Sequence, residues 1–112
     1  MVQIRIPFAY IATTATSGSY SQWKNIKLKQ SDKWKVGFVE IKGRSYGDLL
    51  KPTQEYTLGM FIDGYDACLK INNKIYYKQN TYFEATLVLD VINDSVKVDD
   101  FIDYLNESFN DH

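Results

Sequence analysis

The sequence has few of the residues on which most catalytic and metal sites depend. Its 112 residues include one cysteine, Cys68, and one histidine, His112, at the last position. A single cysteine excludes an intrachain disulfide and favours a cytosolic location. One histidine is too little for the usual Ser-His-Asp arrangement and for most zinc sites, which need four nitrogen or sulfur ligands. We therefore expect no enzyme activity, no cofactor and no bound metal.

Long apolar runs and dividing segments are missing as well. No stretch of the sequence approaches the roughly 20 apolar residues that cross a bilayer, and the first residues do not follow the pattern of a secretory signal. No P-loop or dinucleotide-binding glycine pattern occurs. No repeat or low-complexity tract divides the chain. The sequence therefore predicts a single domain over residues 1–112, in the cytoplasm and without a membrane partner.

Aromatic residues, in contrast, are abundant. They make up 15% of the chain, with nine tyrosines, and favour β-strands. Alternation of apolar and polar residues predicts strands at residues 2–6, 22–29, 33–42, 56–62, 66–71, 74–79 and 81–92. Asn72 and Asn73 predict a type I′ turn between two of these strands, because asparagine tolerates positive φ. Ser45 and Asp48 predict a short helical turn, and the strand at 81–92 is expected to be central.

The period of the apolar residues changes near the C-terminus. Ile102, Leu105 and Phe109 lie at helical spacing, and Asp99 suits the N-cap of a helix. The predicted fold class is therefore α+β. It consists mainly of an antiparallel β-sheet or a small, partly open barrel of six to seven strands, with one C-terminal amphipathic α-helix.

The expected helix carries a row of carboxylates on the side away from its apolar residues. These are Asp100, Asp103, Glu107 and Asp111. No lysine or arginine lies between them, although an exposed helix usually gains stability from opposite charges four residues apart. The row is either a solvated face or an acidic patch that docks on a basic groove of a protein target.

Basic residues gather in an earlier segment. From Lys24 to Lys51 the chain has eight basic and three acidic residues, a balance of +5, whereas residues 80–112 have one and eight, a balance of −7. If strands 22–29 and 33–42 form a hairpin through a three-residue loop, their lysines form two facing pairs on its outward side. These residues are Lys27 opposite Lys35, and Lys29 opposite Lys33, with Trp23 on the same side. The face either protects an edge from aggregation or binds an acidic partner or nucleic acid.

One short motif has an enzymatic parallel. Glu40, Ile41 and Lys42 form a Glu-x-Lys tripeptide on a predicted strand. It is similar to the ExK element of the PD-(D/E)xK nucleases, which implies a metal-binding acid and a lysine that assists the attacking water. That family normally adds an earlier metal-binding Asp and a preceding helix. Here Asp32 is the only upstream acid and no such helix is evident, so we interpret the tripeptide as an ordinary strand end.

The profile that remains is that of a small non-catalytic protein-binding module. Such a module inhibits or neutralises a macromolecular target, as immunity proteins and phage-encoded inhibitors do. We expect the target to be basic or nucleic-acid-binding and to meet the acidic helix, with Tyr76, Tyr77 or Tyr82 as aromatic anchors. The alternatives are a nucleic-acid-binding β domain that uses the lysine-rich face, and a self-associating structural protein of a virion or other assembly.

Overall fold

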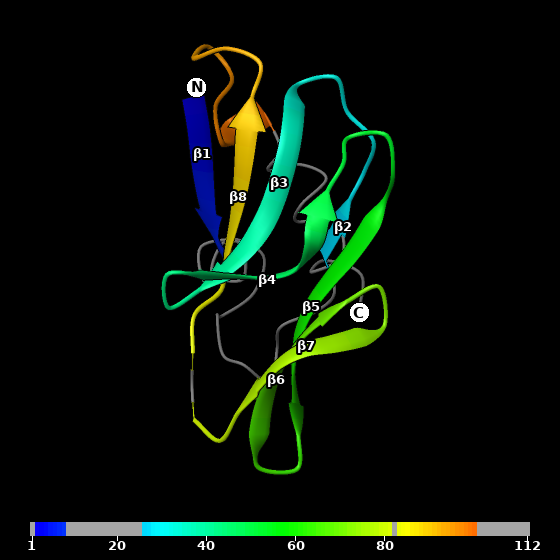
Figure 1. Ribbon diagram of the computed structural model, residues 1–112, viewed down its shortest axis with the longest axis vertical. Helices are drawn as coiled ribbons and strands as arrows, with labels where there is room; N and C mark the ends of the chain where they lie inside the picture. Colours follow the sequence, from blue (N-terminus) through cyan, green and yellow to red (C-terminus); the bar gives the residue numbers. More distant parts are fainter. Residues whose placement is uncertain (1, 9–25, 82, 101–112) are drawn as a thin grey trace.

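The computed structural model describes residues 2–8, 26–81 and 83–100, and this part of the chain forms two antiparallel sheets (Figure 1). The strands are β1 (Val2–Pro7), β2 (Ile26–Leu28), β3 (Trp34–Ile41), β4 (Arg44–Leu50), β5 (Tyr56–Asp63), β6 (Asp66–Ile71), β7 (Lys74–Gln79) and β8 (Thr86–Val91). The first sheet has the order β1-β8-β3-β4, and the second has the order β2-β5-β6-β7.

Strand β8 organises the first sheet. It pairs with β1 on one side and with β3 on the other, as expected for a central strand. Leu87, Leu89 and Val91 face the core and are almost fully buried. Alternate residues of a strand point to opposite faces, so the intervening residues of β8 lie on the outer face of the sheet.

The second sheet is built from consecutive hairpins. Leu58 of β5 is paired with Ile71 of β6, and Met60 with Leu69, and all four side chains join the core. The turn between β6 and β7 has Asn72 at φ 50° and Asn73 at φ 69°. Positive φ at both central residues is the signature of a type I′ turn, so this prediction is confirmed.

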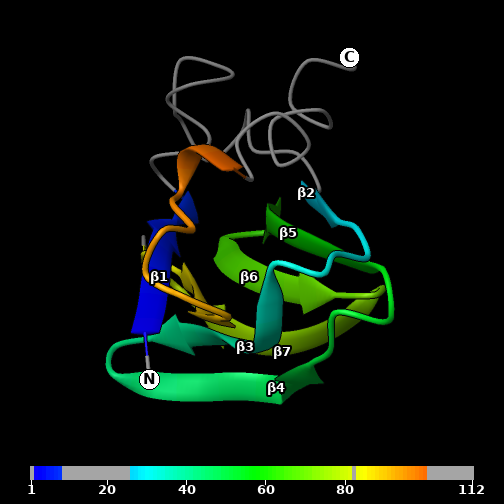
Figure 2. The ribbon, with the colours of Figure 1, turned by 90° about the horizontal axis from the view of Figure 1, so that it is seen from above.

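The two sheets meet where β4 lies beside β7 (Figures 1 and 2). The Tyr77 ring makes edge-on contacts with Tyr46 on one side and Phe83 on the other, each with the ring centroids 4.8 Å apart. The remaining edge strands, β1 and β2, lie on opposite sides of the molecule, so the sheets do not close into a barrel (Figure 2).

The predicted α+β fold class is therefore wrong. The regular elements of the described residues are all strands, more of them than the six or seven expected, and they form two open sheets. No C-terminal helix belongs to this part of the chain, and residues 101–112, to which most of that helix was assigned, lie outside the described residues. No helix among the described residues has the length and apolar character needed to span a membrane.

The predicted lysine-rich hairpin is not formed either. Strand β2 pairs with β5 in the second sheet, whereas β3 pairs with β4 and β8 in the first. Alternation fixes the faces of a strand but not its neighbour, because hydrogen bonding of the backbone is independent of sequence. The chain instead reverses at Lys42 and Gly43, both at positive φ, so that residues 44–50 form β4 rather than the helical turn expected from Ser45 and Asp48.

Candidate functional site

The outer face of the first sheet carries a row of residues that we call the outer strip. Its members are Arg5, Val36, Phe38, Glu40, Val88 and Asp90. Val88 is paired with Arg5 on β1 and with Phe38 on β3, and Asp90 is paired with Val36. Three adjacent strands thus bring together residues that are far apart in the sequence.

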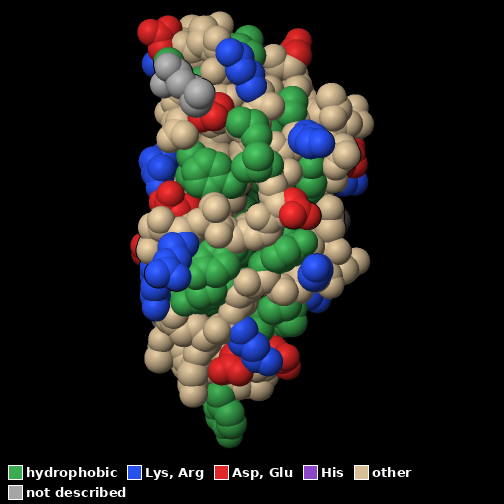
Figure 3. Space-filling model, in the orientation of Figure 1, with side chains coloured by type: hydrophobic (Ala, Val, Ile, Leu, Met, Phe, Trp, Pro, Cys, Tyr) green, Lys and Arg blue, Asp and Glu red, His purple; other side chains and the backbone are tan. Residues whose placement is uncertain are grey.

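The middle of the outer strip is apolar. Val88 is fully buried although it faces away from the core, and Val36 and Phe38 are half-buried. The solvent face of an antiparallel sheet is usually polar, so three adjacent apolar side chains are unusual there. Figure 3 shows hydrophobic side chains gathered over β8 and β3, with charged side chains at the margin. This is the surface that we identify as the candidate site.

A β-bulge creates this apolar middle. The sequence pattern predicts that Trp34, Val36 and Phe38 share one face, but the register of β3 against β8 shifts between Trp34 and Val36. Trp34 is therefore paired with Val91 and lies in the core, whereas Val36 is paired with Asp90 on the outer face. The extra residue of a bulge moves all following side chains to the opposite face. Sequence reasoning missed the outer strip for this reason.

Charged residues flank the apolar middle. The Arg5 guanidinium donates a hydrogen bond to Glu40 Oε1 across β8. Arg5 is paired with Val88, so the two side chains lie on the same face of the sheet. At the other end, Asp90 Oδ1 is buried and has no hydrogen-bond partner. The strip therefore runs from an ion pair to a carboxylate with one buried oxygen that has no hydrogen-bond partner.

A cavity lies near each end of the outer strip. The first has a volume of about 530 Å³ and is lined by Val2, Lys35, Val36, Asp90, Val91 and Ile92. The second has a volume of about 430 Å³ and is lined by Glu40, Lys42, Phe83, Glu84 and Thr86. Both volumes fall within the range of small-ligand pockets.

The second cavity is lined by the two charged residues of the Glu-x-Lys tripeptide, Glu40 and Lys42. Glu40 is held by Arg5, and Lys42 Nζ donates a hydrogen bond of 2.6 Å to Gln79 Oε1. The described residues contain no group of three or more His, Cys, Asp or Glu side chains that could hold a metal ion. The geometry of the described residues thus gives the nuclease resemblance no support.

The structure distributes the predicted basic site over both sheets. Lys27 lies on β2, where its ammonium is 3.6 Å from Glu55 Oε2, and Lys35 lies on β3 beside the first cavity. Lys29 follows β2 and Lys33 precedes β3, so neither predicted pair of facing lysines forms. Trp23 lies outside the described residues.

Of the four carboxylates in the predicted acidic site, the structure describes only Asp100. Asp100 is exposed, and its Oδ2 accepts a hydrogen bond of 2.6 Å from Lys97 N. The other three members, Asp103, Glu107 and Asp111, lie outside the described residues. Their participation in a common acidic face stays a prediction.

The tyrosines expected as anchors differ in their surroundings. Tyr76 and Tyr77 are half-buried, and Tyr77 takes part in the ring contacts that join the two sheets. Tyr82 lies outside the described residues. Tyr65, which sequence reasoning did not single out, is 93% exposed in the loop between β5 and β6. Only its position in a two-residue loop, where polar residues and glycine are common, signals that it is unusual.

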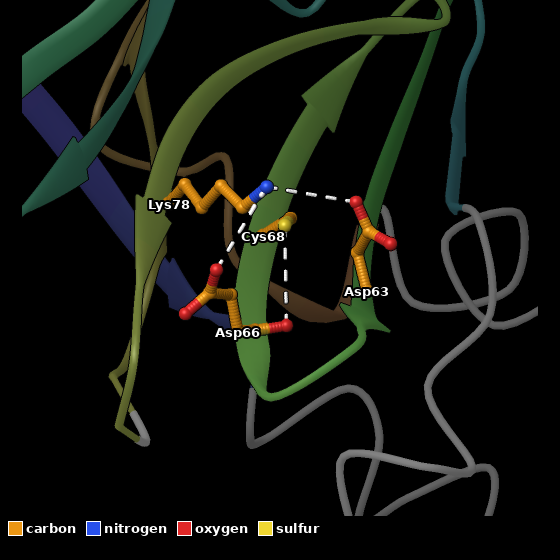
Figure 4. A network of polar contacts seen from close by, with 4 residues as sticks. All are labelled: Asp63, Asp66, Cys68 and Lys78. Atoms are coloured by element: carbon orange, nitrogen blue, oxygen red, sulfur yellow. Dashed lines mark hydrogen bonds and ion pairs between the residues drawn. The ribbon is translucent and has the colours of Figure 1, made fainter.

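A second polar cluster occupies the outer face of the second sheet (Figure 4). Lys78 Nζ lies 3.6 Å from Asp63 Oδ2 and 3.8 Å from Asp66 Oδ2, so one ammonium neutralises much of the repulsion between two directly opposed carboxylates. Cys68 lies beside them and is fully buried. Burial raises the pKa of its thiol, and the nearby Lys78 ammonium opposes this effect only in part.

Cys68 is therefore expected to resist thiol reagents in the native protein. At neutral pH, iodoacetamide should label it slowly in buffer and rapidly in guanidinium chloride, because only a thiolate reacts and only unfolding exposes it. The raised pKa also means that the folded state favours the neutral thiol. The stabilisation is complete below the unfolded thiol pKa, near 9.0, and is lost as the pH rises through the folded value. Labelling that is equally fast in buffer and denaturant would contradict this prediction.

Comparisons with known proteins add no relative. No family model matches the chain, and no curated protein and no solved structure matches it.

Proposed function

We propose that this protein is a small non-catalytic binding module that docks a target protein on its outer strip. The observation that supports the proposal is the pair of half-buried apolar side chains Val36 and Phe38, which lie beside the fully buried Val88 on the face opposite the core. Contiguous apolar patches rimmed by polar residues are typical of protein interaction sites. The strip lies on paired strands rather than on loops, so little conformational entropy is lost when a partner binds.

The strip has the anatomy of an interface. Phe38 supplies an aromatic side chain at the centre, where residues that dominate binding energy are usually found. The Arg5–Glu40 pair and Lys35 surround it with both signs of charge, which orient a partner and exclude mismatched ones. Binding of this kind blocks the target surface by occupancy, and inhibition or neutralisation of the target follows without any covalent step.

The outer strip replaces the acidic helix as the proposed docking surface, because the described residues provide the geometry of the strip and show no C-terminal helix. The alternative of nucleic-acid binding gains nothing from the described lysines. Lys27 and Lys35 belong to different sheets, and Lys27 already faces Glu55. Assembly through self-association is tested by the same variants as the docking proposal.

The experiment compares capture by three immobilised proteins in a lysate of the source organism. They are the wild type, Phe38→Ser in the outer strip, and the matched control Phe61→Ser on the outer face of the second sheet. Phe61 is also half-buried and lies under Lys70, whose Nζ is 4.6 Å from the ring centroid. A target protein should be retained by the wild type and by Phe61→Ser, and its retention should fall at least about tenfold with Phe38→Ser, as for the loss of an interface anchor.

Two results would contradict the proposal. Equal retention of the same proteins by the wild type and Phe38→Ser would place the docking surface elsewhere. Light scattering that shows wild-type oligomers and a monomeric Phe38→Ser variant would assign the strip to self-assembly instead. Far-UV circular dichroism of all three proteins controls for loss of fold.

A further inference from the structure

The cavity at the Asp90 end of the outer strip has a lining of mixed character. Val2, Val36, Val91 and Ile92 line it, and of these Val2 and Ile92 are 38% and 47% exposed, whereas the Val91 side chain belongs to the core. Asp90 supplies a carboxylate and Lys35 an ammonium. An apolar lining with a few polar groups of fixed position is the usual construction of a small-ligand site.

Asp90 is the first unusual group in this cavity. Asp90 is paired with Gln3 of β1 and with Val36 of β3. One of its carboxylate oxygens, Oδ1, is buried and has no hydrogen-bond partner. A partly desolvated carboxylate without a partner is costly. Oδ1 itself is closed to solvent, so a ligand in the cavity meets the accessible part of this half-buried side chain, and the low local dielectric constant strengthens the attraction of the carboxylate to a cationic donor.

Lys35 is the second unusual group. It lies at the bulge of β3, where the register against β8 shifts, and its side chain is exposed. It lines the same cavity as Asp90, but the ion pairs of the described residues do not include one between these two side chains. Bulges often re-aim a side chain next to a functional site. The cavity therefore presents one acidic and one basic group that do not neutralise each other.

We propose that this cavity binds a free α-amino acid with an aliphatic side chain. The ligand ammonium pairs with Asp90, its carboxylate pairs with Lys35, and its side chain packs against Val2, Val36 and Ile92. A simple cation is repelled by Lys35, and a simple anion is repelled by Asp90. A zwitterion with an apolar body satisfies both charges and the lining at once. This site borders the docking surface, but its occupation requires no protein partner.

The experiment is a titration of the ¹⁵N-labelled protein with L-leucine, followed by amide chemical shifts. Saturable shifts are expected at residues 35–36 and 90–92. N-acetyl-L-leucine, which lacks the ammonium, and L-leucinamide, which lacks the carboxylate, should each bind about tenfold more weakly, because each loses one charge-assisted hydrogen bond. Glycine, which lacks the apolar side chain, should also bind more weakly.

Variants separate a built site from weak surface contact. Asp90→Asn should weaken the binding of L-leucine about tenfold and leave the binding of N-acetyl-L-leucine unchanged. Lys35→Gln should weaken the binding of L-leucine about tenfold and leave the binding of L-leucinamide unchanged. Lys33→Gln is the matched control, since Lys33 is exposed nearby but does not line the cavity. Absence of saturable shifts, or equal binding of L-leucine and N-acetyl-L-leucine, would overturn the proposal. The titration uses no target protein, so its failure is distinguishable from failure of the docking proposal.

Discussion

Trp34→Ala is expected to lower the free energy of unfolding by about 3–5 kcal/mol, the range for a large aromatic residue removed from a core. The Trp34 side chain is 2% exposed and belongs to the core cluster. It lies at the start of β3, paired with Val91 of the central strand β8. The loss should appear as a lower urea midpoint with an unchanged slope when unfolding is followed by circular dichroism.

Trp34→Phe separates the size of the indole from its polar atom. Trp34 Nε1 is buried and has no hydrogen-bond partner, so tryptophan carries a desolvation cost that phenylalanine does not. The phenylalanine variant keeps most of the packing and should therefore lose only about 1 kcal/mol. If Trp34→Phe proved as destabilising as Trp34→Ala, the indole N–H would have to contribute a hydrogen bond in solution.

Gly37→Ala is expected to destabilise the protein by about 1–3 kcal/mol, as other overpacked cores do. A Cβ at this position would lie 2.5 Å from Leu89 Cδ2 and 3.0 Å from the Val88 carbonyl oxygen. The side chain of Leu89 can shift, but the carbonyl belongs to the sheet ladder and cannot move without breaking it. Urea unfolding measures the effect.

A double-mutant cycle tests the cause. Leu89→Ala alone should cost about 2–5 kcal/mol because it leaves a cavity. In Gly37→Ala/Leu89→Ala the new methyl group occupies part of that cavity, so the combined loss should be smaller than the sum by at least about 0.5 kcal/mol. Gly43→Ala is the matched control, because no atom lies within 4 Å of its Cβ position and only its φ of 79° opposes a side chain. Strict additivity at positions 37 and 89 would contradict the steric explanation.

Much of the local structure follows from the sequence. Strands at 56–62, 66–71 and 74–79 were predicted within one residue of β5, β6 and β7, because alternation survives wherever a strand has one buried face. The turn at Asn72 and Asn73 was predictable because few residues accept positive φ. The central role of β8 was indicated by its dense apolar pattern.

The sequence was a poor guide where the alternation of apolar and polar residues stops. Residues 44–50 have exposed Gly47, Asp48 and Leu49 within β4, so they carry no alternation. The helix expected from Asp99 depended on residues that lie outside the described part of the chain. The acidic face expected from four carboxylates therefore stays a prediction, whereas the outer strip is a surface that no spacing in the sequence indicated.

The sequence by itself determined the extent of β5, β6 and β7 and the place where two asparagines turn the chain. Only the tertiary structure decided that β2 leaves β3 for β5, and that the bulge after Trp34 turns Val36 and Phe38 away from the core. The physical reason is that side-chain periodicity is local, whereas strand pairing is a non-local choice among backbones with identical hydrogen-bonding groups. A register shift of one residue, which changes the periodicity very little, is enough to bring an apolar group to the surface.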